Sequence, residues 1–300
     1  MGSGRTAAVV HAAFAVCALA CVRPDDAPAT GYPAQGYAQG YGAPYGPGYP
    51  PSYPPAPAYA PVPVPAPSPA PAPTGTPAFY DPDPQGRPTP ILRPDAPAMR
   101  YAAMDGPTCE AELTRRAVPF ARGEPTDGVT TPERLRGPLH GITISTGAPA
   151  AVVARSPMEI FDCRLVLALD DFAAMAAPRG IVAMQHISAY RSKAAHGCTE
   201  KYTGLQHCGA LAVDIASFRL AGGTSWNVQR DFHGSIGAGT CGPGAFPAAP
   251  TAASTGLHAL VCDAADRGIF NVILTPNHNA EHFNHFHVEV TPGAEWMMIH

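Results

Sequence analysis

The chain has 300 residues, including 37 prolines, and a formal net charge of −4. The charge is small and the sequence has no basic face, which argues against a nucleic-acid-binding protein. Most of the prolines precede Arg100, in a tract of Pro, Ala, Tyr and Gly with too few branched aliphatic residues to form a hydrophobic core. We therefore predict one folded domain, residues 105–292, between a long unstructured segment and a short tail at residues 293–300.

Residues 1–20 have the pattern of a signal peptide. Arg5 gives a weakly positive start, residues 7–20 are apolar but short for a bilayer span, and the segment ends in small residues. Cys21, which follows directly, resembles the lipidated cysteine of a bacterial lipoprotein. The pattern predicts export to the periplasm or cell envelope. Two forms remain open, one tethered to the membrane through lipidated Cys21 and one freely secreted.

Residues 21–104 are of low complexity and are interpreted as a disordered linker. Gly-Tyr repeats at residues 31–49 give way to Pro-Ala alternation at residues 54–73. The first part is expected to be flexible, whereas the second favours extended polyproline II and a semi-rigid spacer. The tyrosines could alternatively bind glycans or proline-recognition domains. As a spacer, the linker would let an anchored domain reach into a surrounding wall layer.

Six cysteines remain after those of the signal region are removed. An even number of cysteines in an exported domain predicts three disulfides, and about fifteen connectivities are possible. We favour Cys198 with Cys208, which would close a small loop before the candidate site. Zinc ligation by cysteine is the weaker alternative because the chain has no C-x-x-C pair. The disulfide candidates are Cys109, Cys163, Cys198, Cys208, Cys241 and Cys262.

The first half of the folded domain predicts a mixture of helices and short strands. A helix is expected at residues 110–117, followed by a Gly- and Pro-rich segment through Gly137. Apolar runs at residues 142–145 and 151–154 predict strands. A long helix is expected to begin at Ser156 and to continue to Pro178. Ser156 is a suitable N-cap, a proline occupies the next position, and a glutamate occupies the capping-box position. This helix should pack on a sheet.

The second half predicts more strands and one further long helix. Strands are expected at residues 181–190, 211–219, 270–274 and 286–290, a hairpin at residues 222–223 leading to 226–228, a loop at 234–250 and a helix at 254–268. Helices outside a small, mostly antiparallel sheet define an α+β fold.

Two segments far apart in the sequence contain side chains that bind metals. One runs from His207 to Asp214 and the other from His282 to His287. Histidine and aspartate are zinc ligands, and a catalytic zinc usually has three protein ligands and one open position. Strand alternation would place His285 and His287 on one face and their apolar neighbours on the other. Residues seven apart on one strand face opposite sides, so Gly209 is expected to turn the chain between His207 and the strand of Asp214.

These residues, together with the strand end Ser188-Ala-Tyr-Arg-Ser192, resemble the bacterial extensin-like C-terminal domain family. That family is itself similar to the LAS zinc metallopeptidases, which comprise lysostaphin-type, D-Ala-D-Ala carboxypeptidase and hedgehog-like domains. The resemblance implies a Zn²⁺ ion held by His207, Asp214 and His287, with Arg191 orienting a substrate carbonyl or carboxylate. It further implies a peptidase or amidase that acts on peptidoglycan peptides through a metal-activated water.

The general base is the unusual part of the motif. Members of the family tend to carry a carboxylate three residues before the last ligand, where this chain has Asn284. An amide cannot take up a proton at physiological pH, so His285 is the expected base, with His282 behind it. The alternative is a non-catalytic module that keeps zinc for stability or for binding a wall peptide.

The remaining candidates are interpreted as having no special role. A single histidine is more often hydrogen-bonded or exposed than a metal ligand. Glu281 and Glu289 are interpreted as solvated side chains. The other histidines in this group are His140, His186, His233, His258 and His300.

Overall fold

The computed structural model of the protein describes residues 93–192, 206–247 and 249–300. The predicted signal peptide, Cys21 and the linker up to residue 92 lie outside these residues. In the described part, no helix has both the length and the apolar character needed to cross a bilayer. All of the described residues belong to one compact unit of the chain.

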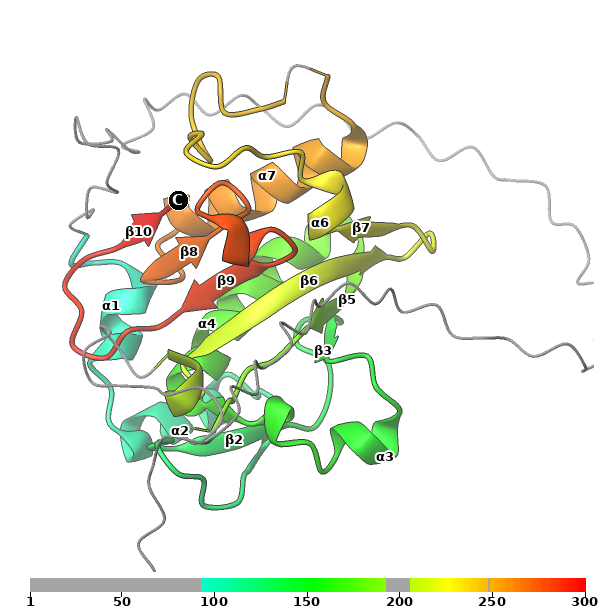
Figure 1. Cartoon of the computed structure of the whole chain (residues 1–300). Helices are drawn as coiled ribbons and strands as arrows, with labels where there is room; N and C mark the ends of the chain where they lie inside the picture. The colour runs from blue at the N-terminus through cyan, green and yellow to red at the C-terminus, as the bar shows by residue number, and fades with distance from the viewer. Residues whose placement is uncertain (1–92, 193–205, 248) are drawn as a thin grey trace, which may run out of the picture. The chain divides into compact units, whose positions relative to one another are not determined.

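The domain contains helices and strands in a mixed order along the chain (Figure 1). The helices are α1 (Pro97–Ala102), α2 (Gly106–Arg115), α3 (Ala150–Val153), α4 (Cys163–Ala176), α6 (Val228–Asp231) and α7 (Ala252–Asp266). The 3₁₀ helices are η1 (Pro157–Glu159), η2 (Ala177–Arg179), η3 (Gln206–Gly209) and η4 (Ala280–His282). The strands are β1 (Phe120–Arg122), β2 (Pro132–Leu135), β3 (Thr143–Ser145), β4 (Phe161–Asp162), β5 (Ile181–His186), β6 (Ala212–Leu220), β7 (Ser225–Asn227), β8 (Val272–Leu274), β9 (Phe286–Glu289) and β10 (Met298–Ile299).

The strands form two sheets. The larger sheet has the order β10-β8-β9-β6-β5-β3, with β7 paired to β6, and the smaller one has the order β1-β2-β4. Pairing is antiparallel except for β3 with β5 and β8 with β10, which are parallel. The predicted α+β class, with a mostly antiparallel sheet and flanking helices, is confirmed.

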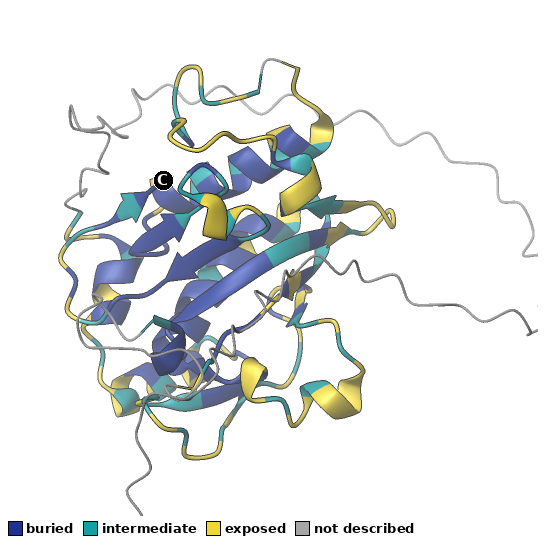
Figure 2. Ribbon diagram, viewed as in Figure 1, coloured by how far each residue is buried: buried dark blue, intermediate teal, exposed yellow. Residues whose placement is uncertain are grey.

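The core lies between the larger sheet and the two long helices. Phe172 of α4 contacts Phe218 of β6, and Phe218 in turn contacts Phe286 of β9. Figure 2 shows α4, α7 and the central strands as a continuous buried block. The alternation predicted for β9 is confirmed, because Phe286 and Val288 belong to this core. The intervening side chains of β9 therefore point to the opposite face of the sheet.

Several predicted elements differ from the structure. Ser156 caps only the short 3₁₀ helix η1, and the long helix α4 begins at Cys163 with Asp162 as its N-cap. The reason is tertiary: β4 pairs with β2, and this keeps residues 161–162 extended. Residues 151–154, predicted as a strand, fall mostly within the short helix α3, which has no buried residue.

The folded domain also extends further along the chain at both ends than predicted. Helix α1 lies within the segment interpreted as linker and contacts α4, and β10 lies within the predicted tail and pairs with β8. The Gly- and Pro-rich segment through Gly137, for which no strand was predicted, contains β1 and β2. Short edge elements of two to four residues carry too little periodicity to be recognised from sequence.

Two of the predicted disulfides are present among the described residues. Cys109 of α2 is bonded to Cys163 at the start of α4, and Cys241 is bonded to Cys262 of α7. The pairing favoured for Cys198 falls on a residue outside the described part of the chain. The first bond ties two helices together, and the second ties the loop after β7 to α7.

A buried carboxyl group lies in the smaller sheet. Glu133 of β2 has no exposed surface and faces Arg122 across the β1–β2 pair. Burial, followed by the negative charge of Glu110, raises the pKa of Glu133 from 4.5 to about 8. Asp162 adds to the same effect, and Arg122 opposes it. Glu133 therefore holds a proton in the folded state that an unfolded chain would release.

This proton predicts a pH-dependent stability. As pH rises from about 4.5 to about 8, the unfolded chain loses the Glu133 proton first, so the free energy of unfolding falls. Each pKa unit corresponds to about 1.4 kcal/mol. Glu133→Gln should therefore lose less stability than wild type between pH 5 and pH 9, in thermal melts at stepped pH. Glu110→Gln removes the neighbouring charge and should give a smaller change in the same direction. Parallel pH profiles for wild type and Glu133→Gln would contradict the assignment.

Candidate metal centre

Three predicted ligands converge on the face of the sheet that points away from α4. Asp214 of β6 and His287 of β9 are direct cross-strand partners, so their side chains lie on the same face. His207 approaches from η3, directly before β6. All three residues are buried. Of the described residues, these three form the one group of three or more His, Cys, Asp or Glu side chains whose donor atoms all lie within 4.8 Å of one another.

The turn that carries His207 has strained backbone. Gln206 has φ 41° and Ala210 has φ 53°, the left-handed region that non-glycine residues rarely occupy. Such residues cost about 1 kcal/mol or more each and are concentrated at functional sites. The chain turns between His207 and β6, as predicted, but the left-handed residues are Gln206, the first residue of η3, and Ala210, which follows it, rather than Gly209.

The three donor atoms form a nearly equilateral triangle. Nε2 of His207 lies 3.1 Å from Oδ1 of Asp214 and 3.2 Å from Nδ1 of His287. Nδ1 of His287 lies 3.1 Å from the same Oδ1 atom. A tetrahedral zinc with bonds of about 2.0–2.1 Å requires ligand atoms about 3.3 Å apart. The triangle fits that requirement to within a few tenths of an ångström.

Hydrogen bonds on the outer side of each imidazole fix which nitrogen faces the centre. Nδ1 of His207 lies 2.7 Å from the carbonyl oxygen of Ala189, which can only accept a hydrogen bond. Nε2 of His287 lies 3.3 Å from Oε2 of Glu289. Each ring can therefore donate its N–H outward and direct the lone pair of its other nitrogen inward. This is how metal-binding histidines are usually oriented.

The interpretation of Glu289 as a solvated side chain is wrong. The side chain is 2% exposed, and its Oε1 accepts a hydrogen bond of 2.7 Å from Thr291 Oγ1. Its position two residues after His287 places both side chains on the same face of β9. The His-x-Glu spacing in the sequence therefore already indicates that Glu289 lies beside His287.

Arg191 contacts the ligand carboxylate directly. Its Nη2 donates to Oδ2 of Asp214, and its Nε donates to Ser188 Oγ at 2.9 Å. The guanidinium thus holds Asp214 with Oδ1 toward the histidines. About a third of the Arg191 side chain is exposed, so its outer edge also faces solvent. The structure pairs Arg191 with Asp214, and the predicted contact with substrate stays a prediction.

The charges of the centre depend on one another. Burial would raise the pKa of Asp214, but His207 and the other histidines hold it well below its ordinary value. Burial lowers the pKa of His207 despite the attraction of Asp214. Burial also acts to lower the pKa of His287, but Asp214 and Glu289 outweigh it and raise the pKa to about 9. The centre thus has an ionised carboxylate and a strong tendency to hold a positive charge.

His285 lies beside this triangle rather than within it. Its Nε2 is 3.3 Å from Oδ1 of Asp214, and its Nδ1 is 2.8 Å from Oδ1 of Asn284. His285 and His287 therefore share a face, as predicted. His282 is one step further out, with its ring 5.1 Å from that of His285. Burial and the nearby histidines lower the pKa of His282 to about 3.

One residue holds the loop that carries these histidines, residues 276–285. Oδ1 of Asn277 accepts from the backbone N–H of Ser235 at 2.8 Å, and its backbone oxygen accepts from Gly237 at 2.8 Å. Its Nδ2 donates to Thr240 Oγ1 at 3.3 Å. The histidine loop is thereby fixed to residues 235–240, which the Cys241–Cys262 disulfide in turn anchors to α7.

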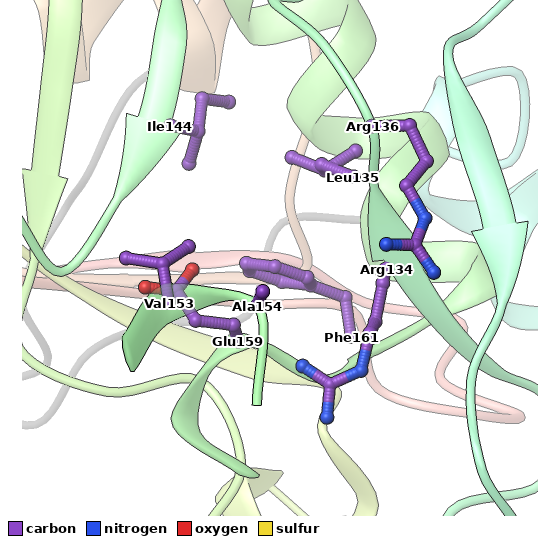
Figure 3. Close-up of a pocket in the computed structure, with 8 residues that line it drawn as sticks. All are labelled: Arg134, Leu135, Arg136, Ile144, Val153, Ala154, Glu159 and Phe161. Atoms are coloured by element: carbon purple, nitrogen blue, oxygen red, sulfur yellow. The ribbon is translucent and has the colours of Figure 1, made fainter. Parts of the chain in front are cut away.

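A small pocket lies away from this centre, against β2 and β4 (Figure 3). Arg134, Arg136, Glu159 and Phe161 contribute to its lining. The carboxylate of Glu159 accepts hydrogen bonds from Thr146 and lies 3.1 Å from Nε2 of His186. The pocket contains none of the predicted site residues, and its one lining carboxylate already has partners.

Comparison with known proteins identifies the family of the chain. The fold and the histidine and aspartate cluster define a disulfide-bonded α+β domain with a candidate metal centre. The family model described as extensin-like protein C-terminus matches residues 108–298, and the chain belongs to that family. Searches of curated proteins and of solved structures found no match.

Glu289 provides a test of the metal centre that does not depend on activity. Glu289→Gln removes the charge behind His287 and should weaken Zn²⁺ binding by about 10–100-fold, the usual effect of losing an outer partner. Competition with a chromophoric chelator would measure the affinity, and the visible spectrum of the Co²⁺-loaded protein would report a changed ligand field. The matched control is Glu124→Gln, which changes an exposed glutamate outside the centre and should bind as wild type does. Equal affinities for both variants would contradict the role of Glu289.

Proposed function

We propose that the domain is an exported zinc-dependent peptidase or amidase that acts on peptidoglycan peptides. The observation that carries the proposal is the triangle of His207, Asp214 and His287, with both imidazoles held by outward hydrogen bonds. A buried set of two imidazoles and one carboxylate suits zinc in a catalytic site with an open position, and zinc binding would displace the proton that His287 tends to hold. We include in this proposal a kinship with the LAS metallopeptidases.

Zinc in this site would lower the pKa of a bound water and polarise a scissile carbonyl. His285 is the residue placed to take the proton from that water. The Asn284 side chain lies 2.8 Å from Nδ1 of His285, so its oxygen can accept the Nδ1–H and leave the Nε2 lone pair toward the centre. Asn284 then orients the base instead of acting as one.

The two other predicted catalytic residues have supporting roles in this proposal. The low pKa of His282 makes it a poor proton acceptor, so it packs against His285 and stays neutral. Arg191 holds Asp214 and presents its exposed edge to a substrate carbonyl or carboxylate. Arginine suits both contacts because it stays charged and can donate several hydrogen bonds in one plane.

The alternative is a zinc-containing module that binds a wall peptide without cleaving it. The observation in its favour is the amide of Asn284 at the position where related domains tend to carry a carboxylate. In either case we propose an envelope location, with peptidoglycan as the partner and either a lipid anchor on Cys21 or free secretion.

A comparison of ligand and base variants separates these functions. Purified protein should contain zinc and cleave defined muropeptides, as followed by mass spectrometry. His287→Ala should lose both properties. His285→Gln should keep zinc and lose about 10²–10⁴-fold in cleavage rate, the usual contribution of a general base. His140→Gln, which changes an exposed histidine outside the centre, is the control.

The outcomes are distinct. Zinc binding without cleavage of any muropeptide would reject the peptidase and leave the binding module. Failure to bind zinc at micromolar supply would reject both functions. Cleavage that is unchanged in His285→Gln would move the base to another residue.

A further inference from the structure

A second pair of histidines repeats the geometry of the first. Nδ1 of His278 lies 3.2 Å from Nδ1 of His300, and the ring centroids are 5.0 Å apart at an interplanar angle of 80°. In the proposed zinc centre, Nε2 of His207 and Nδ1 of His287 are also 3.2 Å apart. The centroids of those two rings are likewise 5.0 Å apart, at 72°. Two nitrogens that converge from nearly perpendicular rings are as well placed for a shared metal in the one pair as in the other.

The backbone holds the second pair in place. His278 follows β8 and His300 follows β10, and these two strands are parallel neighbours in the sheet. Thr275 binds both segments: its N–H and its Oγ1 donate to the carbonyl oxygen of His300 at 2.8 and 3.0 Å, and its own carbonyl accepts from the N–H of His278 at 2.9 Å. The approach of the two rings is thus fixed by the ends of two paired strands.

The surroundings suit a cation of the imidazole-binding type. Burial lowers the pKa of both His278 and His300, which favours the neutral form of each ring, the form that binds metals. Glu281, which is exposed on η4, places a negative charge near His278. His282 adds a third ring, with its centroid 5.2 Å from that of His278.

We propose that His278 and His300 form a second metal site, for a late first-row divalent ion such as Zn²⁺, Ni²⁺ or Cu²⁺. Imidazole ligands prefer these ions to Mg²⁺ or Ca²⁺. The site binds more weakly than the centre at Asp214, because its two fixed ligands are neutral. An ion there would fasten the histidine loop to the end of β10. His282 lies between the two sites, since its ring is 5.2 Å from that of His278 and 5.8 Å from that of His287.

Metal stoichiometry tests the second site separately from the first. Wild-type protein and variants would be dialysed against micromolar Zn²⁺, and the bound zinc counted by elemental analysis. We expect two ions per chain in wild type, one in His278→Gln and one in His287→Ala. A second equivalent of Zn²⁺ should raise the melting temperature of wild type but not that of His278→Gln. His278 is only partly buried, so its replacement should leave the fold intact, and His300→Asn provides an independent removal of the same site.

Each pattern of zinc loss among the variants has one interpretation. A single ion in wild type that persists in His278→Gln and in His300→Asn but disappears in His287→Ala would overturn the second site and leave the zinc centre. A single ion in wild type that persists in His287→Ala but disappears in His278→Gln and in His300→Asn would support the second site and overturn the zinc centre. Two ions in both His278→Gln and His300→Asn would overturn the second site, because the additional zinc would then lie elsewhere.

Discussion

The pairing of β6 with β9 is the constraint on which the rest of the structure depends. The register that sets Asp214 opposite His287 also sets Val213 opposite Val288 and Ile215 opposite Phe286. One set of side chains builds the core against α4 and α7, and the other builds the candidate centre. A shift of one residue in the pairing register would turn the side chains of the shifted strand to the opposite face of the sheet. A shift of β6 would bury the carboxylate of Asp214 among aromatic rings. The hydrophobic core thus enforces the geometry of the polar cluster.

The polar cluster is built in layers around Asp214. Its Oδ1 faces three histidines, while its Oδ2 is held by Arg191. Behind the histidines stand a backbone carbonyl at Ala189 and the carboxylate of Glu289. Buried polar groups are tolerated when each has a partner, and here the partners also decide which atoms point inward. A side chain that does not reach the centre itself can therefore control its donor set.

The sequence is most informative where residue chemistry and strand periodicity agree. His207, Asp214 and His287 can be found from residue type and order, and the shared face of His285 and His287 follows from alternation in β9. The ion pair between Arg191 and Asp214 could not be predicted, because it depends on how the segment after β5 returns to β6. The sequence interpretation of Glu289 fails because glutamates are usually solvated, although its spacing from His287 places it on the same face.

The errors in secondary structure have one physical origin. Ser156, with the proline and glutamate that follow it, has every local signal of a helix start, yet pairing of β4 with β2 delays the long helix to Cys163. Tertiary contacts override local preference there. Strands of two or three residues, such as β4 and β10, take their conformation from their neighbours and leave almost no trace in the sequence.

The attachment of the histidine loop has a consequence for how damage to this protein would be detected. Asn277 is buried, and its hydrogen bonds join two loops rather than the sheet and its helices. Loss of these bonds would free the histidine loop and leave buried polar partners unpaired, at a cost of about 1–3 kcal/mol. A thermal melt would report that cost but not where the structure has opened, and amide hydrogen exchange within residues 276–285 is the observable that would locate the defect in the loop.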